Sequence, residues 1–355
     1  MKSLHTYEDA RRGIQSGARS WLVTGAAGFI GSHLVEHLLA LDQAVVGLDN
    51  FSTGKRANLE HVRGAVGEAR WGRFRFIEGD IRSLDTCNAA CASIDVVLHQ
   101  AGLGSVPRSI DRPLRTHETN VNGFLNMLLA ARDAGAARFV YASSSAVYGD
   151  HAALPKVESQ LGRAMSPYGL SKRLNELYAE VFGVCYRYQS IGLRYFNVFG
   201  PRQDPDGPYA SVIPAWIGAL LRGETAYVNG DGSVARDFCY VDNVVQANLL
   251  AATVQEPQAV GEVYNVAVGG ITTLNQLFEL IRARLAQRLP HLRNVRPVHR
   301  EPRRGDMQLS RADIAKAARL LGYCPEFDLG AGLSRTIEWY IGELAPVSER
   351  SVANA

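Results

Sequence analysis

The chain contains few cysteines and no long hydrophobic run. Its 355 residues include five cysteines: Cys87, Cys91, Cys185, Cys239 and Cys324. So small and odd a number argues against a disulfide framework and indicates a reducing compartment. No apolar run is long enough to span a bilayer, and the first residues are polar and charged, which argues against a signal peptide. We therefore expect a cytoplasmic protein with no membrane partner.

The chain also lacks an excess of charge of either sign. It has 38 basic and 35 acidic residues, which gives a net charge of +3. This balance offers no electrostatic basis for binding nucleic acid, so we expect small-molecule ligands. Cys87 and Cys91 are four residues apart with no second pair nearby, and we interpret them as helix-packing residues. No metal site is therefore expected.

A glycine-rich turn follows the first predicted strand. The apolar strand over 20–24 runs into glycines at 25, 28 and 31, and a helix is expected from there to about residue 41. This order of elements lets the backbone approach a pyrophosphate at a helix N-terminus. The next strand, 44–48, ends in Asp49, and the acid that binds an adenosine ribose stands about 20 residues beyond such a turn. A carboxylate there favours NAD over NADP, although Lys55 and Arg56 nearby favour NADP.

Three further predicted strands end in polar or small residues. The strand over 73–77 precedes Asp80, the strand over 94–99 precedes Gln100, and the strand over 137–142 precedes a run of serines. Ligands of a parallel α/β sheet bind beyond the carboxyl ends of its strands, so Asp80 is a candidate for the adenine amine. His99 closes an apolar strand, and we favour a buried structural histidine over a catalytic one.

Tyr168 and Lys172 stand four residues apart at the start of a predicted helix. Ser166 suits the N-cap and Pro167 the first helical position. The spacing puts both side chains on one face of the helix. A nearby cation and a helix N-terminus both favour phenolate, so the pair predicts a base active nearer neutral pH than an ordinary phenol. The spacing alone also occurs by chance on surface helices.

Short segments that match the motifs of one protein family follow one another over about residues 20 to 340. They are Thr-Gly-x-x-Gly-Phe-Ile-Gly at 24–31, Leu-Asp-Asn at 48–50, Gly-Asp-Ile at 79–81, Ser-Ser-Ser-x-Val-Tyr-Gly at 143–149, Tyr-x-x-x-Lys at 168–172, Arg-Tyr-Phe-Asn-Val-Phe-Gly at 194–200, Gly-Asp-Gly at 230–232, Arg-Asp-Phe-x-Tyr-Val-Asp at 236–242 and Arg-x-Gly-Asp at 303–306. This ordered set resembles the extended short-chain dehydrogenase/reductases, and within them the nucleotide-sugar 4-epimerases, in particular bacterial UDP-N-acetylglucosamine 4-epimerases. The chain departs from the family pattern at Gly102, a position at which alanine is common.

The resemblance implies an α/β fold with two domains. A Rossmann-type doubly wound parallel sheet over 1–198 would bind NAD, with 239–266 returning to it. A smaller C-terminal α/β domain over 199–238 and 267–345 would bind the UDP-sugar. The family commonly dimerises, which would place a homodimer interface on the helices at about 113–134 and 166–184.

The resemblance also implies the roles of individual residues. Tyr168 would be the base, Ser144 a hydrogen-bond donor to the reacting oxygen, and Lys172 the residue that activates Tyr168 and holds the nicotinamide ribose. The implied NAD contacts are Gly25, Gly28, Phe29, Ile30, Gly31, Asp49, Asn50, Ser52, Thr53, Gly54, Asp80, Ile81, Gln100, Ala101, Tyr168, Lys172 and Tyr195. The implied substrate contacts are Gly104, Ser105, Ser144, Ser145, Asn197, Val212, Tyr227, Asn229, Arg236, Arg303, Asp306 and Ser310.

Two positions bear on the reaction and the sugar. Dehydratases and decarboxylases of the superfamily typically carry an acid where this chain has Ala146, so epimerisation at C4 is expected. Ser310 stands where epimerases restricted to unacetylated sugars carry a bulky tyrosine, which predicts interconversion of UDP-N-acetylglucosamine and UDP-N-acetylgalactosamine. The alternatives are a 4-epimerase for UDP-glucose or UDP-glucuronate and, from another class, a non-catalytic NAD-binding regulator.

Overall fold

The computed structural model describes residues 6–302 and 309–344. Arg303 and Asp306 lie outside these residues. Seven parallel strands form the central sheet in the order β11-β6-β5-β4-β1-β2-β3. Their bounds are β1 Ser20–Thr24, β2 Ala44–Asp49, β3 Phe74–Glu78, β4 Val96–His99, β5 Arg138–Ser144, β6 Ile191–Tyr195 and β11 Val263–Val266. The chain reverses direction across the sheet between β1 and β4, which puts the switch point of a doubly wound sheet there.

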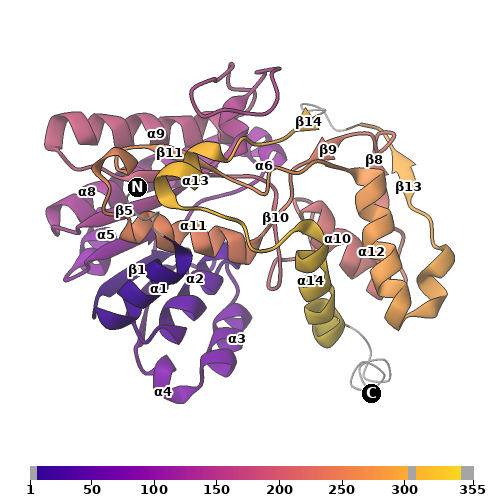
Figure 1. Ribbon diagram of the computed structural model, residues 1–355, viewed down its shortest axis with the longest axis horizontal. Coiled ribbons are helices and arrows are strands. Elements are labelled where there is room, and N and C mark those ends of the chain that lie inside the picture. Colours follow the sequence, from indigo (N-terminus) through magenta and orange to yellow (C-terminus); the bar gives the residue numbers. More distant parts are fainter. Residues whose placement is uncertain (1–5, 303–308, 345–355) are drawn as a thin grey trace.

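Helices cover both faces of this sheet (Figure 1). The helices of the first part of the chain are α1 Tyr7–Ser16, α2 Phe29–Ala40, α3 Arg56–Val66, α4 Glu68–Trp71, α5 Leu84–Cys91, α6 Val106–Asp111, α7 Pro113–His117, α8 Gly123–Asp133 and α9 Pro167–Tyr186, with short 3-10 turns η2 Ser145–Tyr148 and η3 Pro257–Ala259, and α11 Val241–Thr253 returns to the sheet later. Alternate strand residues face opposite layers because side chains alternate along a strand. Trp21 and Val23 of β1 pack with α1, α2 and α11, whereas Leu22 packs with α5, α8 and α9.

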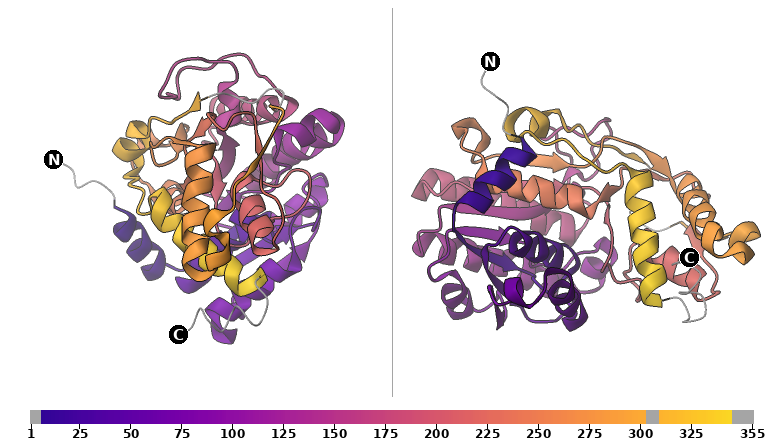
Figure 2. Two further views of the ribbon diagram at one scale, coloured as in Figure 1. Left: turned by 90° about the vertical axis from the view of Figure 1, so that its right-hand side faces the viewer. Right: turned by 60° about the horizontal axis from the view of Figure 1, so that its bottom comes forward.

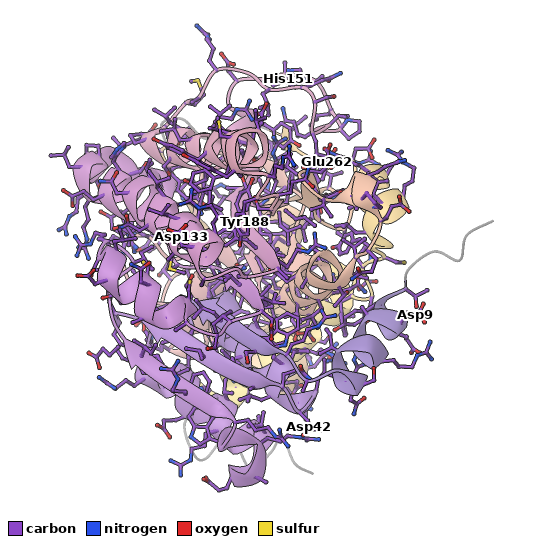
Figure 3. All side chains as sticks on the ribbon, turned by 90° about the vertical axis from the view of Figure 1, so that its left-hand side faces the viewer. Asp9, Asp42, Asp133, His151, Tyr188 and Glu262 are labelled. Atoms are coloured by element: carbon purple, nitrogen blue, oxygen red, sulfur yellow. The ribbon has the colours of Figure 1, made fainter. Side chains whose placement is uncertain are left out.

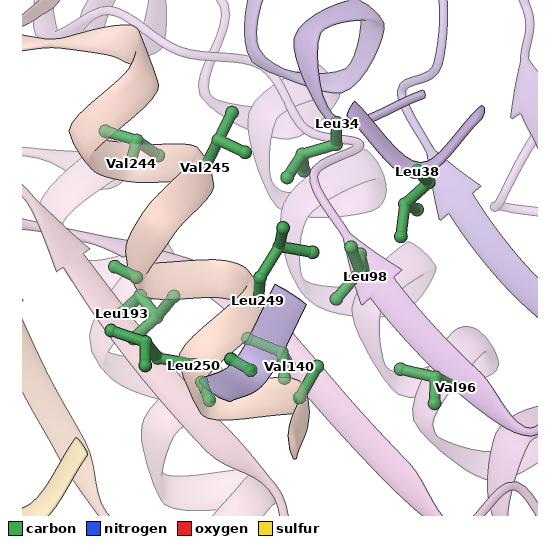
Figure 4. Close-up of a cluster of buried hydrophobic side chains, with 14 of the residues drawn as sticks. Leu34, Leu38, Val96, Leu98, Val140, Leu193, Val244, Val245, Leu249 and Leu250 are labelled. Atoms are coloured by element: carbon green, nitrogen blue, oxygen red, sulfur yellow. The ribbon is translucent and has the colours of Figure 1, made fainter. Parts of the chain in front are cut away.

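Figure 4 shows the first of these layers in detail. Leu34 and Leu38 of α2, Leu98 of β4 and Leu249 of α11 lie together and are fully buried. Asp42, after the end of α2, takes the opposite position: Figure 3 shows it at the outside of the molecule, where it pairs with Arg70. Burial of their apolar faces holds α2 and α11 against the sheet.

A second hydrophobic core lies at one end of the molecule (Figures 1 and 2). It is built on α10 Val212–Leu221, α12 Leu274–Arg288 and α14 Leu329–Leu344, with η4 Pro290–Asn294 beside them. Helix α13 Ala315–Leu321 packs instead in the first core, against β11 and α11. Short strands pair around it: β10 Cys239–Tyr240 with β7 Val198–Phe199, β13 Val298–Arg300 with β8 Tyr227–Asn229, and β12 Thr272–Thr273 and β14 Leu309–Ser310 on either side of β9 Ala235–Arg236. The α/β class is confirmed, while the domain limits remain a prediction.

Local structure refines the sequence prediction at several points. The helical segment at about 113–134 is interrupted by a π-helical turn, η1 Glu118–Asn122, where the side chain of Asn120 is bonded away from its own helix. A polar helix precedes the first strand and begins at Tyr7, where Thr6 and Asp9 form a capping box. Cys87 and Cys91 are buried in α5 as free thiols, as expected of packing residues. None of the helices in the described part of the chain is long and apolar enough to cross a membrane.

Candidate active site

Two adjoining cavities form a cleft between the central sheet and the second core. The larger has a volume of about 620 Å³ and lies at the carboxyl ends of β1, β2, β4, β5 and β6. The smaller, about 530 Å³, lies beside α10 and β8. Asn197, Val198, Ser211 and Arg236 line both cavities and therefore join them. The cleft thus sits at the switch point of the sheet, where ligands of this architecture bind.

The glycine turn leaves backbone exposed at the floor of the larger cavity. Gly25 has φ of 70°, and a Cβ on it would lie 2.9 Å from the Ala101 nitrogen. A Cβ on Gly31 would lie 2.0 Å from the Gly25 oxygen. Helix α2 begins after Gly28 with no side chain capping its amides, so its first N–H groups remain available to a diphosphate. These residues fit the dinucleotide that the sequence predicts.

Asp49 lines the same cavity from the end of β2. One carboxylate oxygen accepts a hydrogen bond from the Ala27 amide at 3.0 Å, and the other accepts one from the Phe51 amide at 2.8 Å. Burial raises the pKa of Asp49. The carboxylate therefore fixes the glycine turn and stands where a ribose hydroxyl would meet it.

Two predicted cofactor residues do not line this cavity. Asp80 accepts hydrogen bonds from Arg82 and Asn50, and the Arg82 bonds lower the pKa of Asp80 to about 2. Asn50 lines the cavity, so Asp80 reaches it only through that side chain. Gly54 packs behind the glycine turn, where a Cβ would lie 2.9 Å from the carbonyl carbon of Ala27. The other predicted NAD contacts all line the cavity.

Ser144, Tyr168 and Lys172 meet at the carboxyl end of β5 and all line the cavity. Helix α9 begins as predicted: the Ser166 hydroxyl accepts from the Gly169 amide, and Pro167 takes the first helical position. The Ser144 hydroxyl accepts from the Ala146 amide at 3.2 Å, so its own hydrogen is available for donation. In the protein alone this hydrogen is directed at the Tyr168 oxygen, because the Ser144 hydrogen bond lowers the pKa of the phenol. The arrangement supplies one donor, one phenol and one cation at a single point.

The expected activation of Tyr168 by Lys172 is not present in this structure. The Lys172 ammonium donates to the Ala142 carbonyl at 2.8 Å, and burial lowers its pKa to about 8. Burial raises the pKa of Tyr168, against a smaller lowering by the hydrogen bond with Ser144. The prediction of a lowered pKa was wrong for the protein alone, because burial of the phenol, which the sequence does not show, raises its pKa.

The predicted substrate residues are divided between the two cavities. Gly104, Ser105, Ser145 and Ser310 line the larger one together with Ser144, Tyr168 and Lys172. Val212, Tyr227 and Asn229 line the smaller one. Asn197 and Arg236 line both, and the predicted Arg303 and Asp306 fall outside the described residues. A ligand with a sugar at one end and a nucleoside at the other would therefore span the cleft.

Comparison with known proteins agrees with this geometry. Residues 21–267 match the NAD dependent epimerase/dehydratase family. The chain belongs to this family. The UDP-glucose 4-epimerase of Thermotoga maritima, solved with UDP-glucose, is 36% identical with a TM-score of 0.82, and the match covers 92% of this chain and 99% of that one.

A second solved structure and one relative carry names that refer to other sugars. The UDP-N-acetylglucosamine 4-epimerase of Methanobrevibacter ruminantium, solved with UDP-N-acetylmuramic acid, is 35% identical with a TM-score of 0.83, covering 92% of this chain and 99% of that one. UDP-glucuronate 4-epimerase 3 of Arabidopsis thaliana is 31% identical, covering 96% of this chain and 83% of that protein. The predicted membership of the nucleotide-sugar 4-epimerases and the NAD cofactor are confirmed.

Behind Tyr168 and Lys172 of this epimerase lies a buried ion pair. Glu176, one turn after Lys172, accepts two hydrogen bonds from Arg194, each at 2.8 Å, and a third from the Ser143 hydroxyl at 2.7 Å. Arg194 belongs to β6 and Ser143 to β5. The network therefore fixes α9 against both strands. The sequence analysis missed it, although a glutamate inside a buried helix face and an arginine at a strand centre are each unusual.

Asn120 holds the loop that follows β4. Its side chain accepts from the Leu103 amide at 2.7 Å and donates to the Leu103 carbonyl at 3.0 Å and to the Ser171 hydroxyl at 3.1 Å. The only hint of this role in the sequence is an asparagine among apolar helix neighbours. His99, by contrast, is a buried structural residue as expected: it bonds Thr24 at 2.9 Å, and burial lowers its pKa to about 3.

Several residues of the cavity walls were not predicted. Thr119, Met165 and Ser211 line the larger cavity, and Arg300 lines the smaller one. Arg300 stacks on Tyr227, with 3.0 Å between its guanidinium carbon and the ring centre. Only their position in the fold brings these residues to the cleft.

Proposed function

We propose that this epimerase interconverts UDP-N-acetylglucosamine and UDP-N-acetylgalactosamine through a 4-keto sugar. The observation that carries the proposal is Ser310. Its side chain lines the larger cavity, and its buried hydroxyl has no hydrogen-bond partner within the described residues. A small side chain with an unused hydroxyl leaves both space and a polar contact for an acetamido group.

The position of Ser310 is fixed by strand pairing. β14 pairs with β9 so that Ser310 lies opposite Arg236, which also lines the cavity. The Asp237 amide donates to the Ser310 carbonyl at 2.9 Å. A tyrosine in this place would project a ring from the same backbone into the sugar end of the cleft, since the backbone is held on that side.

The chemistry that we propose uses three side chains. Tyr168 removes the proton of the 4-hydroxyl, and the hydroxyl hydrogen of Ser144 is donated to the same oxygen as it becomes a ketone. Lys172 holds the nicotinamide ribose and keeps positive charge in the site. NAD supplies the acceptor that takes the C4 hydride and returns it. Return of the hydride to the other face of the ketone, with the proton from Tyr168, gives the C4 epimer.

The surroundings of Tyr168 favour this simple cycle over elimination. Ala146 occupies the wall beside Ser144 and Ser145 where an acid would be needed to expel water.

The carboxylate of UDP-glucuronate would find few cations in the larger cavity. Lys172 and Arg236 are the only cations that line the larger cavity within the described part of the chain, and Lys172 is already bonded to Ala142. UDP-glucose remains the principal alternative, because Ser310 does not exclude a smaller sugar.

We further propose that the epimerase is a cytoplasmic homodimer. Apolar side chains are exposed along α9 and the segment beside it: Leu114 is 78% exposed, Val181 50% and Val184 79%. α7, which carries Leu114, packs against α9, which carries the two valines. A second copy of the chain packed on these helices would remove the exposed side chains from water. The division into an NAD-binding and a UDP-sugar-binding domain, at the limits predicted from the sequence, is part of the same proposal.

The assignment of the sugar is tested by comparing two variants on three substrate pairs. Ser310→Tyr should reduce kcat/KM for UDP-N-acetylglucosamine at least about tenfold more than for UDP-glucose. Ser310→Ala removes the hydroxyl without adding bulk and serves as the control, with a loss of less than about tenfold for the acetylated sugar. Equal losses of kcat/KM on the acetylated and unacetylated sugars in Ser310→Tyr would contradict the assignment. Turnover of UDP-glucuronate alone by the unmodified enzyme would also contradict it.

A further inference from the structure

The segment between β7 and α10 crosses the mouth of the cleft, and we call residues 204–211 the strap. Gly207, Pro208, Ala210 and Ser211 of the strap line the smaller cavity, and Ser211 also lines the larger one. Opposite the strap, Ser105, Val106 and Pro107 at the start of α6 line the larger cavity. The strap and α6 thus form two walls of one cleft, one from each side.

Tyr209 joins these two walls. Its hydroxyl donates to a carboxylate oxygen of Asp111 at 2.8 Å, and the Arg108 guanidinium lies over its ring with 4.8 Å to the ring centre. Asp111 ends α6 and Arg108 lies one turn earlier, so both contacts fall on the same short helix. A phenol bonded to a carboxylate and stacked by a guanidinium combines a charge-assisted hydrogen bond with a cation–π contact.

The two ends of the strap are held more firmly than its middle. Before it, the side-chain amide of Gln203 donates to the Val198 carbonyl at 3.2 Å, and the backbone carbonyl of Gln203 accepts a hydrogen bond from the buried Tyr340 hydroxyl. After it, Ile213 of α10 is buried in the second core. Between these anchors Gly207 has φ of 95°, and a Cβ on it would meet nothing within 4 Å. The middle of the strap therefore has both the backbone freedom and the space to move.

Within the described residues, the other side-chain contacts that join the strap to distant segments are exposed ion pairs. Asp204 pairs with Lys55 at 2.8 Å, and Asp206 with Arg222 at 3.4 Å, with about half of each aspartate side chain or more in solvent. Exposed ion pairs of this kind contribute little to stability. The partner of Asp206, Arg222, follows α10 in the second part of the molecule, so this pair cannot hold the strap against α6.

We propose that Tyr209 is a positioning residue that latches the strap to α6 and closes the cleft over the nucleotide end of the substrate. The inference rests on the proposed function for the identity of the ligand. With the latch made, Ser211 and Ser105 are held at fixed positions on opposite sides of the sugar-binding cavity. When it opens, the strap swings about Gly207 and the nucleotide sugar enters or leaves.

The latch is tested with Tyr209→Phe and Asp111→Asn in the enzyme loaded with NAD. Calorimetry with UDP as the probe should show a dissociation constant raised about fivefold in each variant, because each removes one hydrogen bond that forms only in the closed state. The double variant should bind no more weakly than the weaker single variant, since both changes break one contact. KM for the UDP-sugar should rise by a similar factor, with a smaller change in kcat.

A tyrosine and an aspartate outside the cleft supply controls. Tyr186→Phe at the end of α9 and Asp85→Asn in α5 should bind UDP as the unmodified enzyme does. The latch is overturned if Tyr209→Phe binds UDP with unchanged affinity, or if the losses of the two variants add in the double variant. If the two variants weaken UDP binding as predicted but the unmodified enzyme epimerises no UDP-sugar, only the proposed function is contradicted. If the unmodified enzyme does not bind UDP, both proposals are contradicted.

Discussion

The ammonium of Lys172 is bonded to the carbonyl oxygen of Ala142 at 2.8 Å, which ties the start of α9 to the carboxyl end of β5. Ala142 lies two residues before Ser144, so the same strand end carries the hydrogen-bond donor that we assign to the sugar oxygen. Base, cation and donor are therefore held in one rigid unit. Their relative positions depend on how α9 packs on the sheet.

Burial of Lys172 should limit activity at high pH. Its pKa is lowered to about 8, so the ammonium loses its proton above that pH and the positive charge in the site disappears. We expect kcat/KM to fall above about pH 8. Lys172→Arg keeps the charge at every pH in this range and should lose the fall, although at lower absolute activity. A decline at the same pH in both enzymes would assign it to another group.

The same burial should cost stability. The folded-state pKa of about 8 lies below the ordinary value of about 10.4, so the folded protein binds this proton less tightly than the unfolded chain. The cost is fully present below pH 8 and is relieved as pH rises from 8 towards 10.4. Lys172→Met should therefore raise the free energy of unfolding by about 1–3 kcal/mol at pH 7, and by less at pH 10. Urea unfolding at both pH values measures this, and an equal gain at both would contradict it.

Breaking the ion pair behind the site should destabilise the fold strongly. Arg194→Met removes two hydrogen bonds from the buried Glu176 carboxylate and leaves it with Arg173 and Ser143 as donors, and we expect a loss of about 3 kcal/mol in the free energy of unfolding. Arg194→Met combined with Glu176→Gln removes both charges and should recover a large part of the loss. A double variant as unstable as the sum of the single ones would show that the two side chains are not coupled.

Asp49 and Asp80 should differ in their effect on the cofactor. Asp49→Ala removes the acceptor of the Ala27 and Phe51 amides and the carboxylate at the cavity wall, so we expect NAD affinity to fall at least about tenfold. Asp80→Asn, which changes a side chain outside the cavity wall, is the matched control and should have a smaller effect. Binding of NAD and NADP by fluorescence quenching tests both variants, and a preference of the unmodified enzyme for NADP would contradict the role given to Asp49.

The sequence predicted the parts of this structure that depend on local pattern. The strands around the glycine turn are apolar and follow one another with helices between them, and the cap formed by Ser166 is visible in the residues themselves. The π turn at Asn120 could not be predicted, because its cause is Leu103, 17 residues earlier and brought close only by the fold. The pKa of Tyr168 was predicted in the wrong direction for the same reason: its burial comes from segments distant in the chain.

The most direct measurement is product analysis with UDP-N-acetylglucosamine and NAD equal in concentration to the enzyme. The account predicts many turnovers and an equilibrium mixture containing UDP-N-acetylgalactosamine, since the hydride returns to the same sugar. Tyr168→Phe should be slower by about 10²–10⁴-fold while keeping its fold and its NAD affinity. Formation of UDP-galactose from UDP-glucose without any UDP-N-acetylgalactosamine would contradict the sugar assignment, and unimpaired epimerisation by Tyr168→Phe would contradict the mechanism.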